Sequence, residues 1–280
     1  MIQESCLICG GETSAQHANI VPFLIERCGF DTGATKSRYC AECAFVFFER
    51  RLTASEARRL YANYRKDEYN QMRVRVEPSY APFIPIFDDP SSGYYQARVD
   101  DYLRALSFYP EFYLVRRVLD FGGDGSLPKK LFPGAIVEYD DLSVGKTARD
   151  GPYDLIFASQ VFEHLSAPRD ELARIYDLMD ENGVLFIDIP IEYQGPIAKA
   201  WHQHAQLGGS LVNMHEHINH FSAQSVVNLL RCIELLPFFQ MVTRSPKLGI
   251  TLAARKGSRF ITDSGKATGL STSSVLGRLW

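Results

Sequence analysis

The chain has 280 residues, of which 46% are hydrophobic and 22% charged, so it has room for one full α/β domain plus a smaller unit with the composition of a soluble globular protein. A formal net charge of −3 argues against a protein whose main task is to bind nucleic acid. No apolar run approaches the roughly 18 residues of a membrane span, and residues 1–4 do not begin a signal peptide, which indicates a cytoplasmic protein.

Residues 1–52 contain two Cys-x-x-Cys pairs, Cys6/Cys9 and Cys40/Cys43. Two such pairs supply four thiolates at the spacing that structural zinc requires. Four buried cysteines without a metal, or two disulfides, are the alternatives, and both are less common in cytoplasmic proteins. We therefore predict a small zinc-ribbon-like module with a structural Zn²⁺ ion.

The rest of this module is expected to be strands. Residues 19–30 and 37–48 alternate between apolar and polar side chains, as short strands do. The two remaining cysteines, Cys28 and Cys232, are expected to pack as small apolar residues.

Residues 53–115 form the second region, a helical and loop-rich cover. Thr53 and Glu56 have capping-box spacing and predict a helix over residues 53–64. Four prolines and a glycine in residues 78–93 exclude a long helix there. Residues 94–108 regain helical spacing. Three tyrosines could form a lid or simple packing: Tyr61, Tyr64 and Tyr69.

Residues 116–256 form the main domain, which opens with an apolar strand that ends in a glycine-rich turn. Such a turn lets a ligand lie against the main chain at the carboxyl end of a strand. The next strand, residues 136–141, ends in Asp140 and Asp141. Asp141 follows Asp120 by about the 20 residues at which an acid meets an adenosine ribose. The turn contains Asp120, Phe121, Gly122, Gly123, Asp124 and Gly125.

Further strands and helices then alternate. Strands are predicted at residues 153–159 and 184–190, with a helix at 168–180 between them, and Ser222 caps another helix. Two last strands, residues 238–243 and 250–254, would form a hairpin. This order predicts a mostly parallel α/β sheet with an antiparallel edge. Residues 257–280 are expected to be a tail.

Together these motifs resemble class I S-adenosylmethionine-dependent methyltransferases. The resemblance rests on residues 120–125, the acid after the second strand, residues 153–156 and residues 161–165. Residues 216–222 and the cysteine pairs are similar to the branch of sugar C-methyltransferases. The resemblance implies a Rossmann-like class I sheet. It also implies that residues 120–125 hold the methionine end of S-adenosylmethionine, that Asp141 (or Asp140) binds the ribose, and that Ser159 and Gln160 line the cofactor near its sulfonium.

The resemblance also implies catalytic roles for Glu216, His217 and His164. The chain departs from the family pattern in three ways. Asp124 and Ser126 stand where glycines are usual, residues 142–152 are too few for a helix plus a strand, and the large carboxyl-terminal domain of the sugar C-methyltransferases is missing.

A hydroxyl acceptor must lose a proton, and histidine suits that task near neutral pH. His217 is the first candidate base and His164 the second. A second metal on the histidines of residues 202–220 is an alternative. Glu163 has a simpler interpretation as an acid in the first turn of a helix. The histidines of that segment are His202, His204, His215, His217 and His220.

The favoured function is methylation, by O- rather than C-methylation, of a small molecule such as a sugar, a nucleotide sugar or a surface-polysaccharide precursor. The first alternative is an RNA methyltransferase with a zinc module, which the net negative charge of the chain disfavours. A catalytically inert binding protein with the same fold is the second. A nicotinamide-dependent enzyme is the weakest, because Gly-x-Gly-x-x-Gly is absent.

Overall fold

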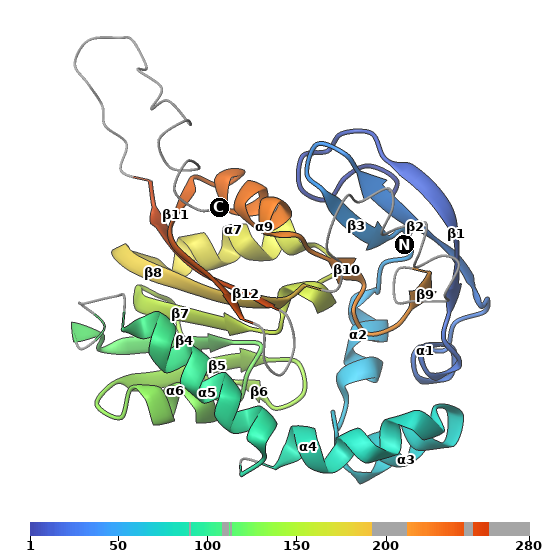
Figure 1. Cartoon of the computed structure of the whole chain (residues 1–280), viewed down its shortest axis with the longest axis horizontal. Coiled ribbons are helices and arrows are strands. Elements are labelled where there is room, and N and C mark those ends of the chain that lie inside the picture. The colour runs from blue at the N-terminus through green and yellow to red at the C-terminus, as the bar shows by residue number, and fades with distance from the viewer. Residues whose placement is uncertain (90, 108–111, 113, 192–211, 244–248, 258–280) are drawn as a thin grey trace.

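The computed structural model describes residues 1–89, 91–107, 112, 114–191, 212–243 and 249–257. Its larger sheet has seven strands in the order β11-β12-β8-β7-β4-β5-β6 (Figure 1). The bounds of these strands are β4 (Arg117–Phe121), β5 (Ile136–Asp141), β6 (Gly145–Lys146), β7 (Tyr153–Ser159), β8 (Met179–Pro190), β11 (Leu235–Thr243) and β12 (Gly249–Lys256).

The centre of this sheet is parallel and both of its edges are antiparallel. β5, β4, β7 and β8 run parallel to one another. β12 is antiparallel to β8, and β11 is antiparallel to β12, which confirms the predicted edge hairpin. The opposite edge ends in β6, a two-residue strand antiparallel to β5. β8 begins earlier than predicted, because Met179 already pairs with Tyr153 before the register shifts.

Helices cover both faces of the sheet. Neighbouring strand residues alternate between the two sides: Val118 packs with α5 and α6, whereas Leu119 packs with α7 and α9. Figure 1 shows these two helix pairs on opposite sides of the strands. Because both faces are covered, the central strands are near-continuous apolar runs. The helices are α5 (Gly93–Leu106), α6 (Ser126–Leu131), α7 (Pro168–Leu178) and α9 (Ala223–Arg231).

The amino-terminal module has its own five-stranded sheet, in the order β10-β3-β2-β1-β9. β1 (Ser14–Ile20), β2 (Ala34–Cys40) and β3 (Phe45–Phe48) come from the module itself. Both edge strands, β9 (Asn213–Met214) and β10 (Asn219–His220), come from the segment between β8 and α9. The module is therefore built together with a segment of the main domain.

Two strand predictions for this module differ from the structure. Residues 37–48 are not one strand, because β2 ends at Cys40 and β3 begins at Phe45. Residues 19–30 do not continue as a strand, because α1 (Pro22–Cys28) begins just after β1. Pro22 stands at the first helical position, where its fixed backbone angle suits a helix and its missing N–H is not needed. Phe23, Leu24 and Cys28 are buried on one face of α1, so packing also favours the helix.

The cover follows as short helices: α2 (Ala54–Tyr61), α3 (Asp67–Val76), a 3₁₀ turn (Pro78–Phe83) and α4 (Ile84–Asp88). Thr53 and Glu56 form the predicted capping box at the start of α2. No long helix lies in residues 78–89, as the prolines predicted. α3 was not predicted, since its sequence is mostly polar and only Tyr69 is buried.

No helix in the described part of the chain is both long enough and apolar enough to cross a membrane. The predicted tail, apart from Gly257, lies outside the described residues, as do His202 and His204.

Candidate functional site

The glycine-rich turn follows β4 directly and is closed by its own acid. Gly125 donates its backbone N–H to Oδ2 of Asp120 over 2.8 Å. Gly122 and Gly125 have φ angles of +77° and +80°, which suit glycine. A Cβ atom on Gly123 would lie 2.2 Å from Oδ2 of Asp120, and one on Gly122 would lie 2.5 Å from Val161. The turn therefore requires backbone without side chains at both positions.

The carboxyl group of Asp120 lies buried beneath this turn. Burial raises its pKa to about 7, despite the hydrogen bond from Gly125, and the negative charges of Asp124 and Asp141 act in the same direction. A buried acid that ionises near neutral pH is common at ligand sites. Of the other two turn residues, Phe121 is buried with the guanidinium of Arg174 over its ring, and Asp124 accepts the N–H of Ser126.

The two acids that end β5 have different surroundings. Asp140 forms ion pairs with Arg174 at 2.9 Å and Lys146 at 3.3 Å. Asp141 caps the turn that follows it, and its three hydrogen bonds, from Ser143 N, Ser143 Oγ and Val144 N, all end on Oδ1. Because Oδ1 of Asp141 already accepts these three hydrogen bonds, Oδ2 is better placed than Oδ1 to accept one from a ligand. Residues 142–152 contain only β6, in agreement with the expected absence of a helix.

A polar network that the sequence did not reveal surrounds Ser159 and Gln160 at the end of β7. Ser159 Oγ accepts a hydrogen bond from Arg98 over 2.7 Å and also contacts Tyr102. The hydroxyl of Tyr102 and the amide of Gln160 both donate to Oδ2 of Asp188. α5 therefore reaches over the sheet edge and fixes both residues. The sequence holds only a weak indication of this network, which is that Asp188 is the one charged residue in the apolar run of residues 184–190.

His164 and His217 lie together near the same edge. Their ring centroids are 4.8 Å apart and their planes are nearly perpendicular. Nδ1 of His164 lies 3.0 Å from the backbone oxygen of Glu216, which can only accept, so Nδ1 donates. Burial and the neighbouring His217 lower the pKa of His164 to about 3. Tyr61 packs edge-on against His164.

Glu163 was predicted to be an acid in the first turn of a helix. It lies in a short 3₁₀ turn (Phe162–His164), five positions before the first residue of α7, and it is only 1% exposed. Its Oε1 atom lies 3.9 Å from Nε2 of His164. The same segment reaches the glycine turn, because Val161 is the residue that would meet a side chain on Gly122.

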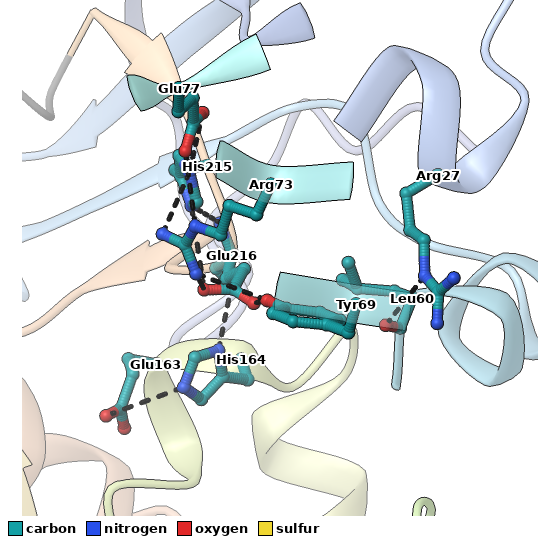
Figure 2. Close-up of polar contacts among 9 residues, drawn as sticks. All are labelled: Arg27, Leu60, Tyr69, Arg73, Glu77, Glu163, His164, His215 and Glu216. Carbon is teal, nitrogen blue, oxygen red and sulfur yellow. Dashed lines mark hydrogen bonds and ion pairs between the residues drawn. The ribbon is translucent and has the colours of Figure 1, made fainter. Parts of the chain in front are cut away.

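The carboxylate of Glu216 lies against Tyr69 and Arg73 of α3 (Figure 2). Its carboxylate accepts a hydrogen bond from the hydroxyl of Tyr69 and lies 2.7 Å from Nη1 of Arg73. Burial would raise the pKa of Glu216, but the positive charges of Arg73 and His215 outweigh it and hold the pKa at about 2. His215 in turn lies 2.9 Å from Glu77. Glu216 thus connects the cover to the segment that carries His217.

Arg51 holds this segment in place from the amino-terminal module. Its guanidinium is fully buried, and burial lowers its pKa to about 9. The side-chain amide of Asn219 donates two further hydrogen bonds, to the backbone oxygens of Phe162 and Leu165 in the 162–166 loop. The acceptors of Arg51 are the backbone oxygens of Phe48, Leu165, Ser166 and Ile218 and the side-chain oxygen of Asn219.

The four predicted zinc ligands come together in the amino-terminal module. One sulfur from each of Cys6, Cys9, Cys40 and Cys43 lies within 4.8 Å of the others, and Cys9 and Cys40 are 3.7 Å apart. The backbone N–H groups of Ile8 and Gly11 donate to sulfur, as they do around thiolate ligands. The cysteines are free thiols.

The remaining cysteines differ from each other. Cys28 is buried as expected, whereas the expectation for Cys232 is wrong, because it is exposed beside Ile8. Of the other histidines, His220 of β10 is buried against Phe48 of β3.

Comparisons with known proteins place this sheet in a family. A family model described as a methyltransferase domain matches residues 92–233, just over half of the chain. No curated protein matches.

Solved structures that resemble the chain include a 1,6-didemethyltoxoflavin N1-methyltransferase of Burkholderia thailandensis with S-adenosylhomocysteine bound. It is 16% identical to this chain. The aligned region covers 78% of this chain and 98% of the methyltransferase, with a TM-score of 0.47. An S-adenosylmethionine-dependent methyltransferase of Clostridium acetobutylicum is 11% identical, with 64% and 98% covered and a TM-score of 0.41. The mitomycin 7-O-methyltransferase MmcR is 14% identical, with 66% and 63% covered and a TM-score of 0.38.

The match over residues 92–233 spans α5, the glycine turn, β5, β7, the 159–164 segment and α9. The chain therefore belongs to the methyltransferase-domain family.

Proposed function

We propose that this methyltransferase methylates a hydroxyl group of a small molecule: a sugar, a nucleotide sugar or a surface-polysaccharide precursor. The observation that carries the proposal is the contact between His164 and His217. His164 lies on the segment whose Val161 contacts the glycine turn, and His217 lies between β9 and β10. The sugar class rests on the resemblance of residues 216–222 and the cysteine pairs to sugar methyltransferases.

The cofactor would lie along the carboxyl edge of β4, β5 and β7. The backbone of residues 122–125 would bind its methionine end, and Asp141 would accept its ribose hydroxyls. Ser159 and Gln160 would line the region of the sulfonium. When bound, S-adenosylmethionine supplies a methyl group activated by a sulfonium. The chain's own residues mainly hold the acceptor oxygen in line with that methyl group.

The acceptor's proton would be taken up by His217. Of the two histidines, His164 already donates Nδ1–H to Glu216 O, so its orientation is fixed by the fold. We assign Glu216 a positioning role, because its carboxylate is engaged by Tyr69 and Arg73 while its backbone oxygen orients His164.

The four cysteines of the module would hold a structural zinc ion. The sulfur separation of 3.7 Å between Cys9 and Cys40 fits a tetrahedral ion with zinc–sulfur bonds of about 2.3 Å. Reduced thiols favour a cytoplasmic location. We propose domain boundaries near residues 52, 115 and 256.

Replacing Gly123 with valine should abolish cofactor binding. Even a Cβ atom would lie 2.2 Å from the carboxylate of Asp120, so the turn would have to open. Asp141→Ala should weaken binding by about tenfold, since it removes one hydrogen-bonded charge at about 1.5 kcal/mol. Calorimetry with S-adenosylhomocysteine measures both effects, with Asp150→Ala as the control. Equal affinities in all four proteins would contradict the cofactor assignment.

Replacing His217 with alanine should lower turnover by about 10²–10⁴-fold, the usual contribution of general acid–base catalysis. Binding of S-adenosylhomocysteine should not change. The measurement is product formation from a panel of nucleotide sugars, followed by mass spectrometry. His17→Ala, at an exposed position in β1, is the control. Full turnover by the His217 variant would remove this residue from the mechanism.

A further inference from the structure

A carboxylate and two imidazoles converge beside the proposed acceptor site. One oxygen of Glu163 and one nitrogen each of His164 and His217 lie within 4.8 Å of one another. Two histidines and one glutamate form a ligand set of catalytic zinc sites. The 3.9 Å between Glu163 Oε1 and His164 Nε2 is about half an ångström more than the roughly 3.4 Å between neighbouring ligands of a tetrahedral zinc ion.

The orientation of His164 suits a cation. Since Nδ1 donates to the backbone oxygen of Glu216, the neutral ring directs the lone pair of Nε2 toward the carboxylate of Glu163. Two electron-rich atoms then face each other in a buried place (Figure 2). Metal-binding histidines characteristically donate their other ring N–H to a backbone carbonyl or carboxylate, which fixes the ring as it is fixed here.

The two segments that carry the three side chains are held at a constant spacing. The N–H of Ile218 donates to the backbone oxygen of Glu163 over 2.9 Å. Arg51 and Asn219 add hydrogen bonds between the 162–166 loop and residues 218–219. A metal site needs ligands that are already in position, and this backbone arrangement provides that.

We propose that Glu163, His164 and His217 bind one zinc ion, distinct from the zinc ion of the four cysteines. Zinc(II) is favoured over redox metals because it accepts this ligand set and methyl transfer needs no electron transfer. Both histidines are only partly buried, so an acceptor could reach an ion held there. This inference rests on the proposed function, since a cation here would lower the pKa of an acceptor hydroxyl and release its proton to solvent. The metal would then replace His217 as the group that activates the acceptor.

The test is the zinc content of the full-length protein, purified with reducing agent and dialysed against excess zinc and then buffer. The wild-type chain should retain two zinc ions, as measured by plasma mass spectrometry. Glu163→Gln and His217→Ala should each retain one, because loss of a ligand weakens binding by more than about 10–100-fold. His17→Ala should retain two. Substitution with cobalt(II) should show one thiolate-rich site and one without sulfur-to-metal charge transfer.

Equal binding of S-adenosylhomocysteine by all variants shows that they are folded. A single zinc ion in the wild-type chain, or a second ion that survives both Glu163→Gln and His217→Ala, overturns the proposal. Methyl transfer by a one-zinc wild type would leave the proposed function intact. Two zinc ions without methyl transfer to any small molecule would instead retain the metal site and remove the proposed function.

Discussion

Replacing Arg51 with methionine should lower the free energy of unfolding by about 3–5 kcal/mol, the usual effect of disrupting a buried charged network. Methionine fills much of the same space, but it leaves the buried acceptors of the guanidinium without their donor. These acceptors belong to three segments: the end of β3, the 162–166 loop and residues 218–219. The variant should therefore also lose methyl transfer, because Glu163 and His164 lie in the 162–166 loop and His217 directly precedes residues 218–219.

Denaturant unfolding, followed by circular dichroism and by tryptophan fluorescence, measures this effect. Arg149→Met is the matched control. The side chain of Arg149 is 85% exposed and forms only a 3.4 Å ion pair with Glu138, so its loss should change stability by less than about 0.5 kcal/mol. If both variants unfold at the same denaturant concentration, the buried guanidinium does not have the structural role described above.

Replacing Glu216 with glutamine should lower the free energy of unfolding by about 3 kcal/mol at pH 7. Glutamine keeps the shape but removes the carboxylate 2.7 Å from the buried guanidinium of Arg73, which would keep, among the described residues, only its ion pair with Glu77 at 3.2 Å. A fall of the pKa from 4.5 to about 2 corresponds to a similar value, since one pKa unit is worth about 1.4 kcal/mol.

The pH dependence has a definite sign. Because the folded pKa of Glu216 is lowered, its contribution is complete above about pH 4.5 and is lost as the pH falls toward 2. The difference in stability between wild type and Glu216→Gln should therefore shrink over that window. Unfolding curves at several pH values provide the measurement. Glu181→Gln, whose side chain is 87% exposed, is the control. A difference that stays constant from pH 7 to pH 2 would contradict the charge-based explanation.

The site was predicted best where its geometry is local in sequence. The glycine turn needs only an apolar strand, an acid and residues without a Cβ atom, all within Val118–Gly125. The capping box at Thr53 spans one helical turn. The hairpin strands at one edge of the sheet and the helix predicted at residues 168–180, observed at Pro168–Leu178, follow from the spacing of apolar side chains. The convergence of the cysteine pairs follows from the known spacing of zinc ligands.

Other features depend on which segments the fold brings together. α1 replaced a predicted strand because Phe23 and Leu24 found a buried face that short-range alternation does not encode. The hydrogen bond from Tyr102 to Asp188 joins residues 86 positions apart, and the bond from Arg51 to Asn219 joins residues 168 positions apart. No spacing rule relates such residues.

The sequence by itself determined the elements of this protein: a glycine turn after a buried strand, an acid after the next strand, paired cysteines and the alternation of strands and helices. Only the tertiary structure decided how residues 212–220 are used. There the chain completes both edges of the amino-terminal sheet and places His217 beside Glu163 and His164. The physical reason is that backbone geometry is set by neighbours in the chain, whereas the meeting of distant side chains is set by the packing of whole sheets and by buried hydrogen bonds such as those of Arg51.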